Sequence, residues 1–191
     1  MPNVMVNNKA NVSTTRGVQG GYIFRAATTN TDIPTAATWT PDDDYWTCLG
    51  YISEDGFTES VSQDSSTSLR DLNLDLVDEV SGTFTETLTL SLMEVAAAPL
   101  STIYGTQNVT ETSGAITVDH NWSKTDESFQ FCLLLLLKND RKWVKFIPEG
   151  KITSRGDFTG NKTTAAQREI TITYVTDDNG SGCKDYYAAV S

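Results

Sequence analysis

The chain has 191 residues, of which 38% are hydrophobic and 20% are charged, and its formal net charge is −11. This composition fits one folded domain, with or without long arms, and excludes wholesale disorder. It also argues against tight binding of DNA or RNA, because a nucleic-acid binder needs a dominant basic surface.

The first half of the chain reads as an arm followed by strands. Residues 1–19 are polar with few large apolar groups, so we expect a flexible N-terminal arm before a single domain spanning residues 20–191. Strands are expected at residues 20–26, 45–52 and 57–61. The last two form a predicted hairpin whose turn contains a glycine able to take a positive φ.

Residues 62–80 are predicted to form a long, acidic loop. Loops of this length often have a function, and the leucines in this one need a surface to lie against. We therefore expect an intermolecular contact here that becomes ordered on assembly. The candidate contact residues are Leu69, Arg70, Asp71, Leu72, Leu74, Asp75, Leu76 and Asp78.

Residues 82–92 alternate with period two, which predicts a long strand with one apolar face and one face of small hydroxyls. The apolar face must be buried, and the hydroxyl face can meet water. It is predicted to be either the wall of a lumen or an outer wall, and it carries Thr83, Thr85, Thr87 and Thr89.

The rest of the chain predicts one helix and several strands. A helix is expected at residues 97–104, closed by Gly105. A non-alternating run of leucines predicts a strand covered on both faces. The order of elements predicts a mainly β protein, a sandwich or barrel of two packed sheets with one short flanking helix. The later strands are expected at residues 115–120, 129–138, 142–147, 151–154, 167–176 and 186–190.

Charge is unevenly distributed along the chain. Residues 26–123 contain sixteen carboxylates and one basic residue, whereas residues 138–168 contain eight basic and three acidic residues. One interpretation is an ordinary solvated surface; the other is that copies meet head to tail, acidic surface on basic surface. The predicted basic stacking surface consists of Lys142, Lys145, Lys151 and Arg155.

No pattern typical of catalysis or of a cofactor is present. The only histidine, His120, has no companions for a metal site or a catalytic triad, and no glycine-rich phosphate loop precedes a helix. We therefore expect no enzyme activity, no metal and no cofactor. The longest apolar run, residues 131–137, is too short to span a membrane, so no membrane association is expected.

The order of these elements resembles the major tail protein (tail tube protein) family of long, non-contractile-tailed bacteriophages. The resemblance covers residues 20–189 and is strongest between Glu94 and Gly105 and between Phe146 and Thr153. The segments that carry it are the hairpin with Gly56, the acidic loop, the strand 83–92, Glu94, the helix ending in Tyr104-Gly105, Asn108-Val109-Thr110, Lys142-Trp-Val-Lys-Phe-Ile-Pro-Glu-Gly150-Lys-Ile-Thr and Glu169-Ile-Thr-Ile-Thr-Tyr-Val175.

The resemblance implies a structural virion protein, assembled in the host cytoplasm, whose hexameric rings stack head to tail into the tail tube. The loop 62–80 is then expected to carry contacts between rings. Its expected partners are further copies of itself and, at the tube ends, other tail proteins. The tape-measure protein and passing DNA are expected in the lumen, without tight binding. An acidic lumen would repel DNA and let it slide. The alternatives are a tube protein of a contractile injection system and a β-sandwich carbohydrate-binding module built on the tryptophans.

Overall fold

The computed structural model describes residues 12–19, 22–176 and 180–189 and gives a mainly β chain with one α-helix. The predicted fold class is therefore confirmed. Its helix is α1 (Ala97–Tyr104), which has the predicted bounds and ends at Gly105, whose φ is +93°. The strands are β1 (Arg16–Gly17), β2 (Ile23–Ala27), β3 (Thr47–Cys48), β4 (Ile52–Gln63), β5 (Thr67–Arg70), β6 (Leu76–Val80), β7 (Phe84–Leu92), β8 (Val109–Thr112), β9 (Ala115–Val118), β10 (Ser128–Leu136), β11 (Lys142–Thr159), β12 (Gln167–Tyr174) and β13 (Lys184–Tyr187).

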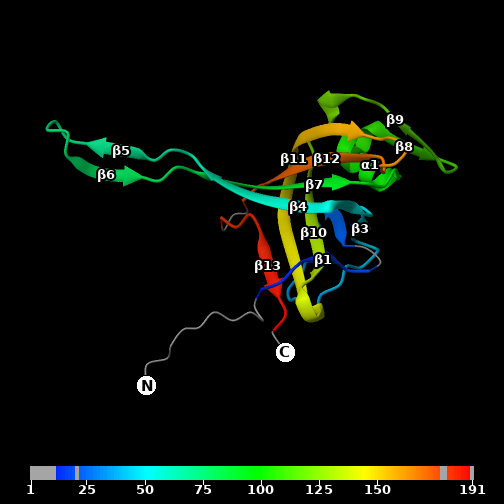
Figure 1. Cartoon of the computed structure of the whole chain (residues 1–191). Helices are drawn as coiled ribbons and strands as arrows, with labels where there is room; N and C mark the ends of the chain where they lie inside the picture. Colours follow the sequence, from blue (N-terminus) through cyan, green and yellow to red (C-terminus); the bar gives the residue numbers. More distant parts are fainter. Residues whose placement is uncertain (1–11, 20–21, 177–179, 190–191) are drawn as a thin grey trace, which may run out of the picture.

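The body of the molecule has two layers of β-strands. One nine-stranded antiparallel sheet forms both of them. The main path runs β3-β2-β10-β11-β12-β7-β4, and β1 and β13 add to β10 and β11. The first half of β11 pairs with β10 and β13, and its second half pairs with β12. Strand β11 is 18 residues long and curves strongly between the two layers (Figure 1). The sandwich is thus one sheet folded over, rather than two separate sheets.

Gly150 stands where β11 changes partners. A Cβ at this position would lie 2.7 Å from the Ile172 side chain and 2.9 Å from the Phe131 ring. Only a residue without a side chain lets β10 and β12 approach β11 this closely. Two register shifts follow in the β11–β12 ladder, and such bulges increase the bend and twist of a strand.

The core lies between the two layers and is filled by alternating residues of β7, β10 and β12. Leu88, Leu90 and Leu92 of β7 are at most 2% exposed, and they share one cluster with Phe131 and Leu133 of β10. A second cluster covers the other face of β10 with side chains from β2, β11 and Trp46. The prediction that the leucine-rich strand is covered on both faces is therefore confirmed.

Two predicted loops are extended strands in the structure. The expected hairpin turn at Gly56 is a bulge inside the single strand β4, where the pairing to β7 shifts between Ile52 and Phe57. A glycine with φ of +77° serves a bulge as well as a turn, so the sequence signal was ambiguous. The predicted loop 62–80 is likewise a hairpin, formed by β5 and β6 on the ends of β4 and β7.

The predicted N-terminal arm is described only in part. Residues 1–11 lie outside the described residues. Within residues 12–19, Arg16–Gly17 forms β1, which pairs with the end of β10 at Leu135 and Leu136.

Candidate functional site

Four strands of the body form a sheet with an open polar face. They are the second half of β11, β12, β7 and β4, in that order. Their inner face packs on the core, and their outer face carries mainly threonine and serine. The Thr89 and Thr171 hydroxyls lie 3.1 Å apart across β7 and β12, and the Thr153 and Thr173 hydroxyls lie 2.7 Å apart across β11 and β12.

The predicted hydroxyl face of residues 83–89 is part of this open surface. Thr85, Thr87 and Thr89 pair with Ser62, Ser60 and Thr58 of β4, so the row of hydroxyls continues across the strand boundary. Thr83 precedes β7, and its hydroxyl donates to Asp64 at 2.6 Å. Which medium or partner this face meets stays a prediction.

A polar hollow of about 330 Å³ lies at one end of the open face. It is lined by three carboxylates, from Asp55, Asp157 and Glu169, together with Ser91, Thr159 and Gln167. The end of the face is thus acidic, whereas its middle is neutral. An anion such as a nucleic-acid phosphate would be repelled by this end.

Both outer edges of this four-stranded sheet are open within the described part of the chain. Strand β4 pairs with β7 on one side and with no strand on the other. Residues 152–159 of β11 pair only with β12, because the pairing with β10 stops at Lys151. Such edges offer rows of backbone N–H and C=O groups to another chain.

The hairpin of β5 and β6 projects far from the body (Figure 1). We call residues 61–84 the arm, and every residue from 58 to 81 is exposed. The arm contains all the residues predicted to form an intermolecular contact, and its tip presents Leu72 and Leu74 at 104% and 74% exposure. Exposed apolar side chains on a projecting hairpin are typical of an interaction surface.

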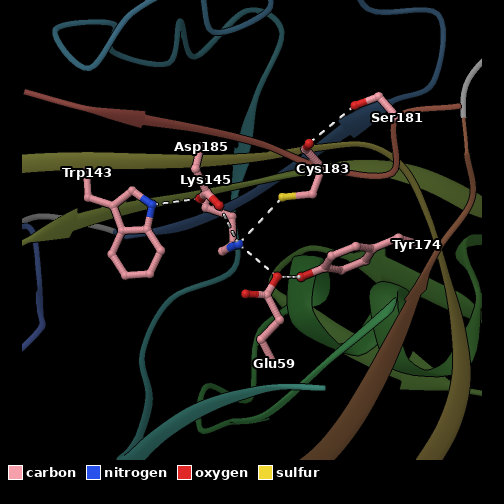
Figure 2. Close-up of polar contacts among 7 residues, drawn as sticks. All are labelled: Glu59, Trp143, Lys145, Tyr174, Ser181, Cys183 and Asp185. Atoms are coloured by element: carbon pink, nitrogen blue, oxygen red, sulfur yellow. Dashed lines mark hydrogen bonds and ion pairs between the residues drawn. The ribbon is translucent and has the colours of Figure 1, made fainter. Parts of the chain in front are cut away.

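A buried ionic network joins the base of the arm to the body (Figure 2). Lys145 of β11 is 1% exposed, and its ammonium nitrogen lies 2.8 Å from Glu59 Oε1 and 3.1 Å from Asp185 Oδ2. The Tyr174 hydroxyl donates to the same Glu59 oxygen at 2.8 Å, and Trp143 Nε1 donates to Asp185 at 2.7 Å. The network therefore connects β4, β11, β12 and β13.

The pKa values of Lys145, Tyr174 and Cys183 keep each of these three groups in one protonation state near neutral pH. Burial alone would lower the pKa of Lys145, but the hydrogen bond with Glu59 and the neighbouring negative charges outweigh it, so the pKa lies above its usual value. Burial and the hydrogen bond to Glu59 raise the pKa of the Tyr174 phenol. Burial also raises the pKa of the Cys183 thiol to about 12. Lys145 is thus charged, while Tyr174 and Cys183 are protonated.

The predicted basic stacking surface is wrong for Lys145, which is the centre of this buried network. The other three residues are separated along β11. Lys142 is exposed at its start, Lys151 pairs with Asp126 at 3.0 Å, and Arg155 Nε donates to the Ile103 carbonyl at the end of α1. Successive side chains of a strand point to opposite faces, and β11 also bends, so these four side chains do not lie on one surface. No local sequence pattern indicates the acceptors that surround Lys145, because Glu59 and Asp185 are 86 and 40 residues away in the chain.

The tryptophans do not form an open platform for a sugar. Trp46 is 3% exposed and packs edge-on against Trp39, whereas Trp122 lies in a different cluster beside Tyr104. In the described ranges no group of three or more His, Cys, Asp or Glu residues is placed to hold a metal ion. Nor does any helix there have the length and apolar character needed to cross a membrane.

Similarity to a known protein family covers most of the chain. The profile of a family described as phage tail tube protein matches residues 6–187. No curated protein matches the chain. One solved structure, titled "Virion of native gene transfer agent (GTA) particle", is 13% identical with a TM-score of 0.38, over 78% of this chain and 92% of that one. A similarity this low does not establish a shared fold.

Proposed function

This chain belongs to the phage tail tube protein family, and from that premise we propose that its copies close into hexameric rings that stack head to tail. Membership makes it a structural virion component that associates with itself, and not an enzyme. The stacked rings would form the conduit through which the genome leaves. The ring size of six follows from the resemblance of the sequence to non-contractile tail proteins.

The observation that carries the proposal is the four-stranded sheet with two open edges. Neighbouring strands in this sheet are antiparallel, so β4 and the second half of β11 run in opposite directions. When β4 of one copy pairs with β11 of the next, the antiparallel alternation continues without a break. Repeating the same heterologous contact closes a ring and pairs both open edges of this four-stranded sheet.

The hydroxyl face would then line the lumen. The opposite face of the same sheet packs on the core, so the hydroxyl face is the one left free to form the wall of a closed barrel. Threonine and serine offer DNA no positive charge, and the acidic hollow at the end of the face repels phosphates. Passing DNA and the tape-measure protein would therefore slide along the lumen without tight binding. Other tail proteins would meet the open rings at the tube ends.

Electron microscopy of the purified chain over a series of protein and salt concentrations tests this proposal. We expect rings or tubes of uniform bore with sixfold averages. A chain that stays a monodisperse monomer under every condition, including with preformed tail ends added, would contradict it.

A further inference from the structure

The arm and a second apolar surface lie at opposite ends of the same strands. The arm leaves the body at the Gln63 end of β4 and the Phe84 end of β7. At the other end of the sheet, Leu92 of β7 pairs with Arg168 of β12, which pairs with Phe158 of β11. In a head-to-tail stack of rings, the arm end of one ring faces this opposite end in the next ring.

A shallow apolar pocket lies at this opposite end, beside α1. Its rim carries Val95 and Phe158, which are 64% and 56% exposed. Its apolar lining is completed by Leu92, Leu100, Ile103, Tyr104 and Ala166. An isolated subunit has nothing to cover these side chains, so the rim is suited to an apolar partner.

Arg168 places an unpaired cation in the pocket. Its guanidinium lies 5.3 Å from the Tyr104 ring, and it has no hydrogen-bond or ion-pair partner among the described residues. Its Nε is buried without an acceptor. The carboxylate of Glu94, which also lines the pocket, accepts from the Tyr51 backbone N–H instead. The terminal nitrogens of the guanidinium are not among the buried atoms, so a carboxylate supplied from outside can pair with them and offset the charge.

The tip of the arm carries a carboxylate that matches this requirement. Asp71 Oδ1 accepts from the backbone N–H groups of Asn73 and Asp75 at 2.9 Å each and so fixes the turn. The side chain of Asp75, by contrast, has no partner among the described residues. It lies between Leu74 and Leu76, which are 74% and 54% exposed.

The reach of the arm fits a contact between rings, and its electrostatic attraction is local. Residues 64–80 contain five carboxylates and one arginine, and the three carboxylates of the polar hollow lie at the same end of the sheet as the pocket. The pairing of one arm carboxylate with the unpaired Arg168 therefore has to outweigh the repulsion between these two acidic regions. About ten residues separate the base of the arm from its tip. At roughly 3.3 Å per residue, the arm extends on the order of 30 Å beyond its own core.

Resting on the proposed stacking of rings, we propose that the arm tip of one copy docks in the Arg168 pocket of a copy in the adjacent ring. Asp75 pairs with Arg168 there, and Leu72 and Leu74 pack against Val95 and Phe158. The occupant of the pocket is thus a second copy of this chain. The contact holds rings together but takes no part in closing a ring, which uses the edges of β4 and β11.

A charge exchange tests the pair directly. Asp75→Arg and Arg168→Asp are each expected to raise the protein concentration needed for tube formation at least tenfold, while rings still form. The double variant, with the charges exchanged, is expected to return that concentration to within threefold of wild type. Arg168→Gln serves as a milder variant in case Arg168→Asp does not fold, and urea unfolding checks the fold of each.

Two controls change the net charge equally at exposed sites. Lys138→Glu alters the turn between β10 and β11, and Glu111→Lys alters the β8–β9 hairpin; both positions are exposed, and both variants should form tubes as wild type does. Normal tubes from Asp75→Arg, or a double variant no better than the single ones, would overturn the docking contact and leave the proposed function standing. A wild-type chain that forms neither rings nor tubes would overturn both.

Discussion

The body and the arm use the same kind of β-pairing but bury very different amounts of side chain. In the body, Leu88 of β7 and Leu133 of β10 are 0% exposed. The arm begins in β4 and ends in β7, and every one of its residues from 61 to 81 is exposed. An isolated two-stranded hairpin is marginally stable in water at best. The arm therefore depends on the body for its direction and on a partner for the burial of its leucines.

The Lys145 network lies at the boundary between the two regions. Glu59 belongs to β4 just before the arm begins, and Lys145, Tyr174 and Asp185 belong to the body. An ion pair with a fixed geometry specifies direction more strictly than an apolar contact would. We interpret the network as the support that aims the arm.

The largest expected effect is the loss of tubes on removing the arm tip. Deletion of residues 67–78 removes β5, the whole turn and most of β6. All of these residues are exposed, so the urea midpoint should stay close to wild type while tube formation is abolished. Electron microscopy and urea unfolding measure the two effects. Removal of the exposed tip of the β8–β9 hairpin, residues 112–115, is the control and should leave tubes intact. Normal tubes without the arm tip would show that the arm is dispensable.

Truncation of a leucine to alanine should lower stability in the body and weaken assembly in the arm. Leu88→Ala creates a cavity in the core and should lower the free energy of unfolding by about 3 kcal/mol. Leu72→Ala, at a side chain with no contacts to lose, should leave the urea midpoint unchanged and weaken assembly. Equal losses of stability in both variants would mean that the arm tip packs against its own chain.

Removing the buried cation should have a smaller effect on stability. Lys145→Met leaves the Glu59 and Asp185 carboxylates facing each other, but both are about one-third exposed and can regain water. We expect a loss of about 2 kcal/mol in the free energy of unfolding, measured in urea. Lys142→Met, at an exposed position of the same strand, is the control. A Lys145→Met chain as stable as wild type would mean that the ion pairs only offset the desolvation of the lysine.

The smallest expected effect is a loss of stability in alkali. The pKa values of Lys145 and Tyr174 are raised by folding, so their contribution to stability is complete below the unfolded values of about 10 to 10.4. It is lost as the pH rises through the higher folded values. The urea midpoint of wild type should therefore fall above about pH 10, and Tyr174→Phe should show a shallower fall. Tyr51→Phe, at an exposed tyrosine, should keep the wild-type slope; an identical slope for Tyr174→Phe would contradict the role of the network.

The sequence predicted local features well and long-range ones poorly. Period-two alternation located the buried face of β7, and Gly105 marked the end of α1, because both signals lie within a few residues. In the Lys145 network, Lys145 is 86 residues from Glu59 and 40 residues from Asp185, and no local sequence pattern indicates such contacts. The Gly56 bulge was predicted as a turn because a positive φ suits both. The β5–β6 hairpin was predicted as a loop because its strands lack the alternation that a core imposes.

A cryo-electron microscopy reconstruction of the assembled tube tests the central claim most directly. We predict a sixfold ring in which β4 of each subunit pairs antiparallel with residues 152–159 of β11 in the next, with the hydroxyls of Thr87 and Thr171 facing the lumen. A tube whose subunits meet through other surfaces, or whose lumen is lined by the opposite face of this sheet, would contradict it.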